Sequence, residues 1–250
     1  MGGPGSVRER FEAAKSSGRP LVGGHRGNPA EHPENTLRSF ESALALGVDL
    51  IECDVHLSSD GELIVIHDHT VTRTTDGRGF VQSLKLAELR ELDAGAGEKL
   101  PLLDEVIDVV RGRAGLVIEA KAVAAIRYPG LEQKLLEKLR ETEMVEQSAV
   151  ISFYHPSVKL LKELEPALQA GIIEAGTPVD PIALMRQAQA DIYSPHFSGV
   201  DSPLVEAVHQ IGGTVGVWVV DDPAAVAWVQ VARPDAVFTD RPAEILPLLR

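Results

Sequence analysis

The chain has 250 residues, of which 24 are Lys or Arg and 37 are Asp or Glu, so its formal net charge is −13. With 44% hydrophobic and 24% charged residues, the composition is that of a folded globular protein. This acidic balance argues against nucleic acid and anionic membrane surfaces as partners, because both require clustered cationic side chains. The single cysteine, Cys53, excludes an intramolecular disulfide and a multi-cysteine zinc site.

The sequence carries no clear targeting or membrane signal. No apolar run approaches the roughly 20 residues that a membrane-spanning helix needs. Residues 1–19, expected to form an N-terminal leader and a first helix, lack the apolar stretch of a signal peptide. We therefore expect a cytoplasmic protein without a stable membrane anchor, and the sequence leaves its oligomeric state open.

Eight short runs rich in Val and Ile recur along the chain, with stretches of helical spacing between most of them. Runs with so little alternation are typical of strands buried on both faces of a parallel sheet. No glycine-rich dinucleotide loop follows the first run, so the pattern predicts a closed (β/α)₈ TIM barrel of the α/β class, in one domain over residues 1–250. The expected strands are 21–24, 50–56, 115–120, 148–153, 170–174, 191–194, 214–220 and 235–239.

Three helices in the second half of the chain should begin where a capping side chain precedes a proline. The pairs are Asp180-Pro181, Ser202-Pro203 and Asp222-Pro223. Proline is favoured at the first helical position, directly after a capping residue. Their spacing matches the length of successive strand–helix units.

A hairpin and a long insertion are expected after the second strand. If Asp60-Gly61 is a two-residue turn between β-like runs, Asp54 lies opposite His67. Residues 68–97 are polar, turn-rich and longer than a barrel connection requires. They are interpreted as an inserted loop or small subdomain over the carboxyl-terminal mouth of the barrel.

Glu52 and Asp54 lie on one face of the second strand, because side chains alternate along a strand. Two carboxylates on one apolar strand would repel each other and be costly to desolvate. Oxygen ligands of this kind suit Ca²⁺ or Mg²⁺. A solvated, salt-bridged pair is the alternative for this short spacing alone.

Two histidines are candidates for catalysis together with this candidate metal site. His25 and Arg26 follow the first strand in a glycine-rich segment, where barrel enzymes gather their chemistry. An arginine there suits a phosphoryl group, although a capped turn with a surface arginine is equally compatible. The expected hairpin brings His67 beside the two carboxylates as a catalytic histidine; a histidine bonded to backbone at a strand end is the alternative.

Two later segments add candidates. Glu119 and Lys121 share a face at the end of the third barrel strand, as a third metal carboxylate and a second phosphate contact, or as a buried ion pair. Trp218 ends the seventh barrel strand, where it could belong to the core or form a wall for a polyol.

Together these segments resemble the glycerophosphodiester phosphodiesterase family, in order and over essentially the whole chain from residue 21. The resemblance implies a (β/α)₈ barrel, one divalent cation (Mg²⁺ or Ca²⁺), and hydrolysis of a small glycerophosphodiester to sn-glycerol 3-phosphate and an alcohol. The matching segments are HRGNPAEHPENT (25–36), IECDVHLSSDGELIVIHDHTVTRTTDGRG (51–79), VIEAK (117–121), GVWVVDD (216–222) and DAVFTDRP (235–242).

The resemblance also implies roles for individual residues. His25 and His67 resemble the family's acid/base pair, and Arg26 and Lys121 its phosphate contacts. Asn35 is expected to shape its loop and cap the following helix. The metal carboxylates would be Glu52, Asp54 and Glu119.

Two alternatives stay open. A relative with the same site could cleave lysophospholipids in the manner of a phospholipase D, but this would require an apolar groove beside the mouth. The barrel could also bind phosphodiesters without catalysis; the sequence, however, retains every histidine and metal carboxylate of the pattern.

Overall fold

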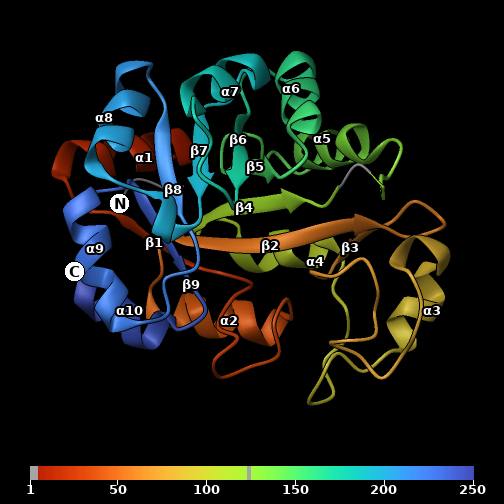
Figure 1. Cartoon of the computed structure of the whole chain (residues 1–250). Coiled ribbons are helices and arrows are strands. Elements are labelled where there is room, and N and C mark those ends of the chain that lie inside the picture. The colour runs from red at the N-terminus through yellow and green to blue at the C-terminus, as the bar shows by residue number, and fades with distance from the viewer. Residues whose placement is uncertain (1–4, 123–124) are drawn as a thin grey trace.

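The computed structural model of the chain describes residues 5–122 and 125–250. In this part of the chain, parallel strands close into a barrel because β1 pairs with both β9 and β2 (Figure 1). The expected (β/α)₈ barrel is thereby confirmed; residues 1–4 of the expected leader lie outside the described residues. The barrel strands are β1 (Leu21–Gly24), β2 (Leu50–Leu57), β4 (Gly115–Ala120), β5 (Ser148–Ser152), β6 (Gln169–Glu174), β7 (Ile192–Pro195), β8 (Thr214–Val217) and β9 (Ala236–Thr239).

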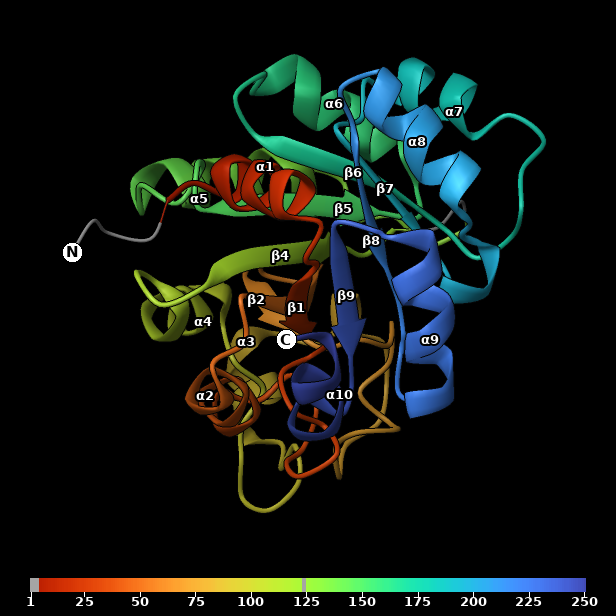
Figure 2. The ribbon, with the colours of Figure 1, turned by 90° about the vertical axis from the view of Figure 1, so that its left-hand side faces the viewer.

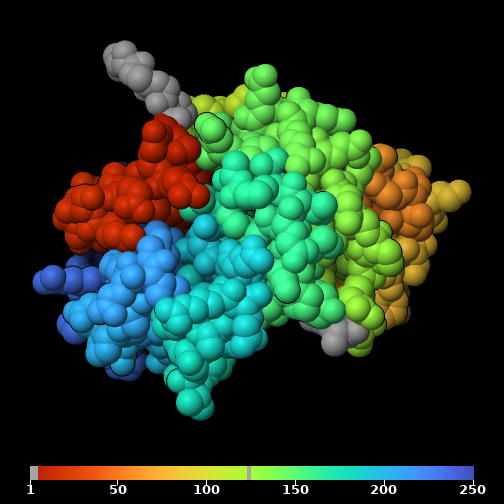
Figure 3. Space-filling view, turned by 90° about the horizontal axis from the view of Figure 1, so that it is seen from above, coloured from red at the N-terminus to blue at the C-terminus, as the bar shows by residue number. Residues whose placement is uncertain are grey.

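Helices cover the outside of the barrel, which explains why its strands show little polar alternation. In the space-filling view from above, the segments from α5 (Leu131–Glu141) to α8 (Ser202–Gln210) lie next to one another in chain order, from green to blue (Figure 3). The longest described helices have 11 residues, and none in the described part of the chain could cross a membrane. The covering helices are α2 (Leu37–Leu46), α4 (Leu103–Val110), α5 (Leu131–Glu141), α6 (His155–Leu164), α7 (Pro181–Ala188), α8 (Ser202–Gln210), α9 (Pro223–Ala232) and α10 (Pro242–Leu249).

Helix α1 (Val7–Ser17) lies across the amino-terminal end of the barrel, which faces the viewer in Figure 2. Its buried Val7 and Phe11 belong to the same apolar cluster as Leu50, Val117 and Phe238 from the barrel strands. This packing removes apolar surface from water and closes one end of the barrel. The candidate site residues lie at the opposite, carboxyl-terminal end of the barrel.

The insertion after β2 lies beside that carboxyl-terminal end (Figure 1). It comprises β3 (Leu63–Val65), a 3₁₀ turn η1 (Val81–Ser83) and α3 (Leu86–Glu91). Its side chains form a small apolar core separate from the barrel, which gives this segment a fixed shape. That core includes Ile64, Ile66, Val71, Val81 and Leu89.

The hairpin is present, but its predicted register is wrong. Ile66, and not His67, lies opposite Asp54, and its N–H donates to the Asp54 carbonyl oxygen at 3.0 Å. The turn spans 59–61, with Gly61 in the left-handed region at φ 82°. A three-residue hairpin loop with a left-handed glycine is a common form, and the extra residue shifts the pairing by one. His67 lies beyond Val65, the last residue of β3.

Two of the three predicted helix starts are confirmed. The side chains of Asp180 and Asp222 cap α7 and α9, each followed by proline in the first turn. Ser202 is not the cap of α8, as predicted. Asp201 caps it instead, with its carboxylate accepting from the Leu204 N–H at 2.9 Å. A carboxylate one residue earlier reaches the free N–H groups of the first turn, so the helix starts sooner.

Candidate active site

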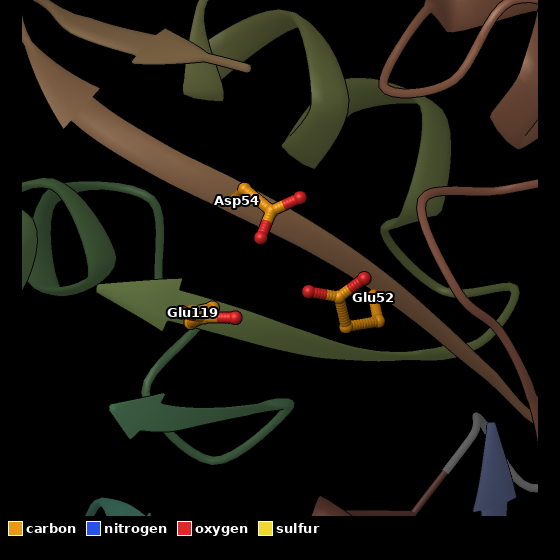
Figure 4. A group of neighbouring side chains, drawn as sticks. All are labelled: Glu52, Asp54 and Glu119. Atoms are coloured by element: carbon orange, nitrogen blue, oxygen red, sulfur yellow. The ribbon is translucent and has the colours of Figure 1, made fainter. Parts of the chain in front are cut away.

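Three buried carboxylates meet between β2 and β4 (Figure 4). Glu52 and Asp54 project from β2, and Glu119 lies on β4 in register with Asp54. One oxygen of each lies within 4.8 Å of the others, and no residue of the three is more than 8% exposed. Buried oxygen ligands grouped this closely could hold a divalent cation. The structure thus brings together the three residues that the sequence singled out.

Lys121 and Arg26 lie directly against this group of carboxylates. Lys121 Nζ is 2.8 Å from Asp54 Oδ1 and 2.7 Å from Glu119 Oε1. Arg26 Nη1 is 2.9 Å from Glu34 Oε1, and its Nε is 3.4 Å from Asp54 Oδ2. Both expected phosphate contacts therefore stand at the site, and both are paired with carboxylates there.

Burial and charge separate the acidities of the three carboxyls. Burial, reinforced by the Asp54 carboxylate, raises the pKa of Glu52 to about 8. Burial also raises the pKa of Glu119, although Lys121 opposes this shift. For Asp54, burial favours the neutral form, but Lys121 and Arg26 outweigh it and hold the pKa below its usual range. A cation that binds Glu52 near neutral pH must therefore displace a proton.

Each candidate histidine has a carboxylate on its Nδ1. His25 Nδ1 lies 2.7 Å from Asp240 Oδ1, and its Nε2 lies 4.0 Å from Glu52 Oε2. His67 Nδ1 lies 2.7 Å from Asp68 Oδ1. A carboxylate on Nδ1 assigns the proton of the neutral ring to that nitrogen and leaves Nε2 to exchange protons.

The two histidines differ in acidity. Burial alone would lower the pKa of His25, but the Asp240 hydrogen bond and the Glu52 charge outweigh it and raise the pKa. For His67, burial lowers the pKa, with the Asp54 charge opposing the shift. Two imidazoles with opposite pKa shifts at one site are suited to an acid/base pair.

A cavity of about 290 Å³, here called the first cavity, opens onto these groups. His25, Arg26, Glu52, His67 and Glu119 form its polar side. Its other side is mainly apolar, so it could enclose a small, partly apolar ligand. That side consists of Ile151, Phe153, Ile173, Ser194, Trp218 and Phe238.

Trp218 lines the first cavity and is half-buried against the apolar cluster inside the barrel. Its role as a wall for a polyol stays a prediction. Its indole Nε1–H donates to the Ser194 carbonyl oxygen at 2.9 Å, and its ring meets Phe153 edge-on. These contacts fix the ring at the cavity wall. A larger cavity of about 620 Å³ lies at the amino-terminal end, against α1 and α8, far from the carboxylates.

The prediction that Asn35 caps α2 is wrong. Thr36 is the cap, with its hydroxyl accepting from the Ser39 N–H. Asn35 has a left-handed backbone at φ 56°, which turns its side chain inward. Its Nδ2 donates to Asp54 Oδ2 at 2.7 Å, and its Oδ1 accepts from the Asp54 N–H at 3.3 Å. Asn35 thus holds the central carboxylate in place.

Asp240, the carboxylate partner of His25, was not predicted from the sequence. It follows β9, and β9 pairs with β1 so that Thr239 is in register with Gly24. In a closed barrel, the residue after the last strand necessarily stands beside the residue after the first. The predicted closure of the barrel, together with the carboxylate at position 240, would have indicated a hydrogen-bond partner for His25.

Residues 25–244 match the model of the glycerophosphoryl diester phosphodiesterase family. The chain belongs to this family. The match covers both histidines, all three carboxylates and the insertion, and it confirms the resemblance and enzyme class expected from the motifs.

Relatives and solved structures of this family match over nearly the whole chain. A glycerophosphodiester phosphodiesterase of Caldanaerobacter subterraneus subsp. tengcongensis is 36% identical over 240 residues, covering 93% of this chain and 98% of the relative. One from Bacillus altitudinis is 32% identical, covering 87% and 93%. The structure of an Oleispira antarctica phosphodiesterase in complex with the product sn-glycerol-3-phosphate has a TM-score of 0.82 and 30% identity, covering 94% of this chain and 98% of that one.

Proposed function

We propose that this protein hydrolyses glycerophosphodiesters to sn-glycerol 3-phosphate and an alcohol, with Mg²⁺ or Ca²⁺ held by Glu52, Asp54 and Glu119. The observation that carries the proposal is that two histidines, each held by a carboxylate, line the same cavity as two members of the buried acidic group. Phosphodiester hydrolysis needs a base, an acid and positive charge near the phosphoryl oxygens. The product complex of the Oleispira relative supports this substrate class.

His25 and His67 would carry the protons. One would accept a proton from the attacking hydroxyl or water, and the other would donate one to the departing alkoxide, each through its Nε2. Asp240 and Asp68 would keep the rings oriented and stabilise the cationic form of each imidazole.

The remaining residues would bind and orient the diester. When bound, the divalent cation would offset the charge on the phosphoryl oxygens. Arg26 and Lys121 would donate hydrogen bonds to those oxygens, because their charged ends lie against Asp54 in the cluster of carboxylates beside the first cavity. Trp218 would form an apolar wall against the glycerol carbons. We also propose that the chain acts as one barrel domain, with residues 68–97 as an insertion at its mouth.

The test is release of sn-glycerol 3-phosphate from glycerophosphoethanolamine and glycerophosphocholine, with Mg²⁺, with Ca²⁺ and with EDTA. Activity should require a divalent cation and should be lost in Glu52→Gln/Asp54→Asn, while the matched hairpin variant Glu62→Gln keeps it. Undiminished activity in EDTA would refute the metal role. Turnover of a lysophospholipid in place of the water-soluble diesters would indicate the phospholipase-D-like alternative, and binding without turnover would indicate a non-catalytic barrel.

A further inference from the structure

A second cavity, of about 380 Å³, adjoins the first. The two cavities share His67, Glu119 and Phe153, so they meet beside a candidate acid/base histidine and a candidate metal ligand. A phosphodiester has two arms, and a phosphorus atom at this junction would direct one arm into each cavity. The second cavity is lined by His67, Asp68, His69, Thr70, Glu119, Lys121, Ala122 and Phe153.

We propose that the second cavity binds the leaving alcohol, and that His69 selects alcohols that can donate a hydrogen bond, such as ethanolamine. This inference rests on the proposed function. The first cavity is built largely from barrel strands and contains His25 and Arg26, which suits the glycerol 3-phosphate arm common to all substrates. The second is more open and is formed partly by the segment that follows β3, as expected for a site that accepts a variable group.

The His69 ring is held by a buried chain of hydrogen bonds. Its Nδ1 lies 3.2 Å from the hydroxyl oxygen of Tyr128, and the Nδ1 of His56 lies 2.6 Å from the same oxygen. The rings of His69 and Tyr128 are nearly parallel, with an interplanar angle of 18°. His56 is fully buried, and its Nε2 lies 3.1 Å from the carbonyl oxygen of His67.

These linked hydrogen bonds determine which ring nitrogens of His56 and His69 carry a hydrogen. A carbonyl oxygen only accepts, so His56 Nε2 carries a hydrogen. The His56 ring is fully buried and its hydrogen-bond partners are both neutral, so the ring is uncharged and its Nδ1 accepts from the Tyr128 hydroxyl. The Tyr128 oxygen then accepts from Nδ1–H of His69. Burial also lowers the pKa of His69, and the neutral ring keeps a lone pair on Nε2.

The charged groups of the second cavity are already paired with each other or with neighbours. The Asp68 carboxylate accepts from Arg73 at 2.8 Å and faces His67, and Lys121 lies between Asp54 and Glu119. A quaternary ammonium would therefore find no unpaired carboxylate among the described lining residues. A primary ammonium or hydroxyl group, in contrast, could donate to His69 Nε2.

The experiment compares kcat/KM for glycerophosphoethanolamine and glycerophosphocholine, which carry the same net charge but differ in hydrogen-bond donors. Wild-type protein should favour the ethanolamine diester. His69→Phe keeps a ring but removes the acceptor, and should lower kcat/KM for the ethanolamine diester about tenfold while leaving the choline diester nearly unchanged. His69→Gln can again accept at the outer position and should restore the preference. His32→Phe, a histidine outside both cavity linings, should leave the ratio unchanged.

Two results would overturn the assignment of His69: a wild-type preference for the choline diester, or an unchanged ratio of the two kcat/KM values in His69→Phe, whether both values fall equally or neither falls. If His69→Phe does not fold, as judged by circular dichroism and thermal melting, the wild-type preference and His69→Leu decide the matter. Failure of the wild-type protein to release sn-glycerol 3-phosphate from either diester would refute the proposed function itself. Turnover with an unaltered ratio would refute only the role of His69.

Discussion

Asp240, directly after the last barrel strand, accepts a hydrogen bond at 2.7 Å from Nδ1 of His25, directly after the first. The two residues are 215 positions apart in sequence and meet because β9 closes onto β1. This contact couples the closure of the barrel to the orientation of a candidate catalytic imidazole. The Nε2 of His25 is thereby directed toward Glu52.

We expect Asp240→Asn to lower kcat by a factor on the order of 10² or more, with KM changed little. The amide can donate to His25 Nδ1 and so favours the wrong tautomer, an effect that is large in other carboxylate–histidine pairs. Steady-state kinetics measure this change, and Asp222→Asn, which keeps a capping side chain on α9, serves as the matched control. A decrease of only a few-fold in Asp240→Asn would contradict an orienting role.

Glu52→Gln should stabilise the metal-free protein, increasingly so as the pH rises toward 8. The pKa of Glu52 is raised to about 8 in the folded state. The stability that this group contributes is therefore complete below its pKa in the unfolded chain, and it is lost as the pH rises from that pKa through the pKa in the folded protein. Glutamine cannot ionise and avoids this loss, which should amount to at least about 1 kcal/mol. Urea unfolding in EDTA at pH 5 and pH 8 measures the difference. A variant less stable than wild type at pH 8 would show that the ionised Glu52 side chain does not destabilise the folded protein.

Cation binding should release protons at neutral pH and strengthen as the pH rises from 6 to 8. Burial keeps Glu52 largely protonated below its raised pKa of about 8, and a metal ligand must lose that proton. Calorimetric titration with Ca²⁺ or Mg²⁺ in buffers of different ionisation enthalpy reports the number of protons released. The same apparent enthalpy in every buffer at pH 7 would exclude this linkage.

Asn35→Ala should destabilise the protein by about 1–3 kcal/mol, because it leaves buried groups of Asp54 without hydrogen-bond partners. Asn35→Gly removes the same side chain but suits the left-handed backbone, so it should cost less than the alanine variant. Gln189→Ala, at another left-handed position on the surface, estimates the backbone cost alone. If Asn35→Ala cost no more than Gln189→Ala, the two hydrogen bonds would be unimportant for stability.

The barrel and its group of buried carboxylates could be predicted because both depend on short-range sequence patterns. Strands buried on two faces are apolar without alternation, and β2 is buried at all eight of its positions. On such a strand, Glu52 and Asp54 stand out as charged residues on one face. The same alternation predicted that Glu119 and Lys121 share a face of the neighbouring strand.

Two of the wrong predictions, the hairpin register and the Asn35 cap, depend on backbone geometry that sequence patterns do not encode. The left-handed Gly61 lengthens the hairpin turn and moves His67 out of register with Asp54. The left-handed backbone of Asn35 turns its side chain onto Asp54 instead of the helix end. Neither conformation follows from the residue type alone, although both glycine and asparagine adopt it readily.

A crystal structure with Mn²⁺ and sn-glycerol 3-phosphate, with the ion located by anomalous scattering, tests the central claim most directly. We predict one ion within about 2.0–2.6 Å of a carboxylate oxygen from each of Glu52, Asp54 and Glu119. The phosphate should lie between His25 and His67, and the glycerol against Trp218. An ion bound elsewhere, or a phosphate away from both histidines, would contradict the account.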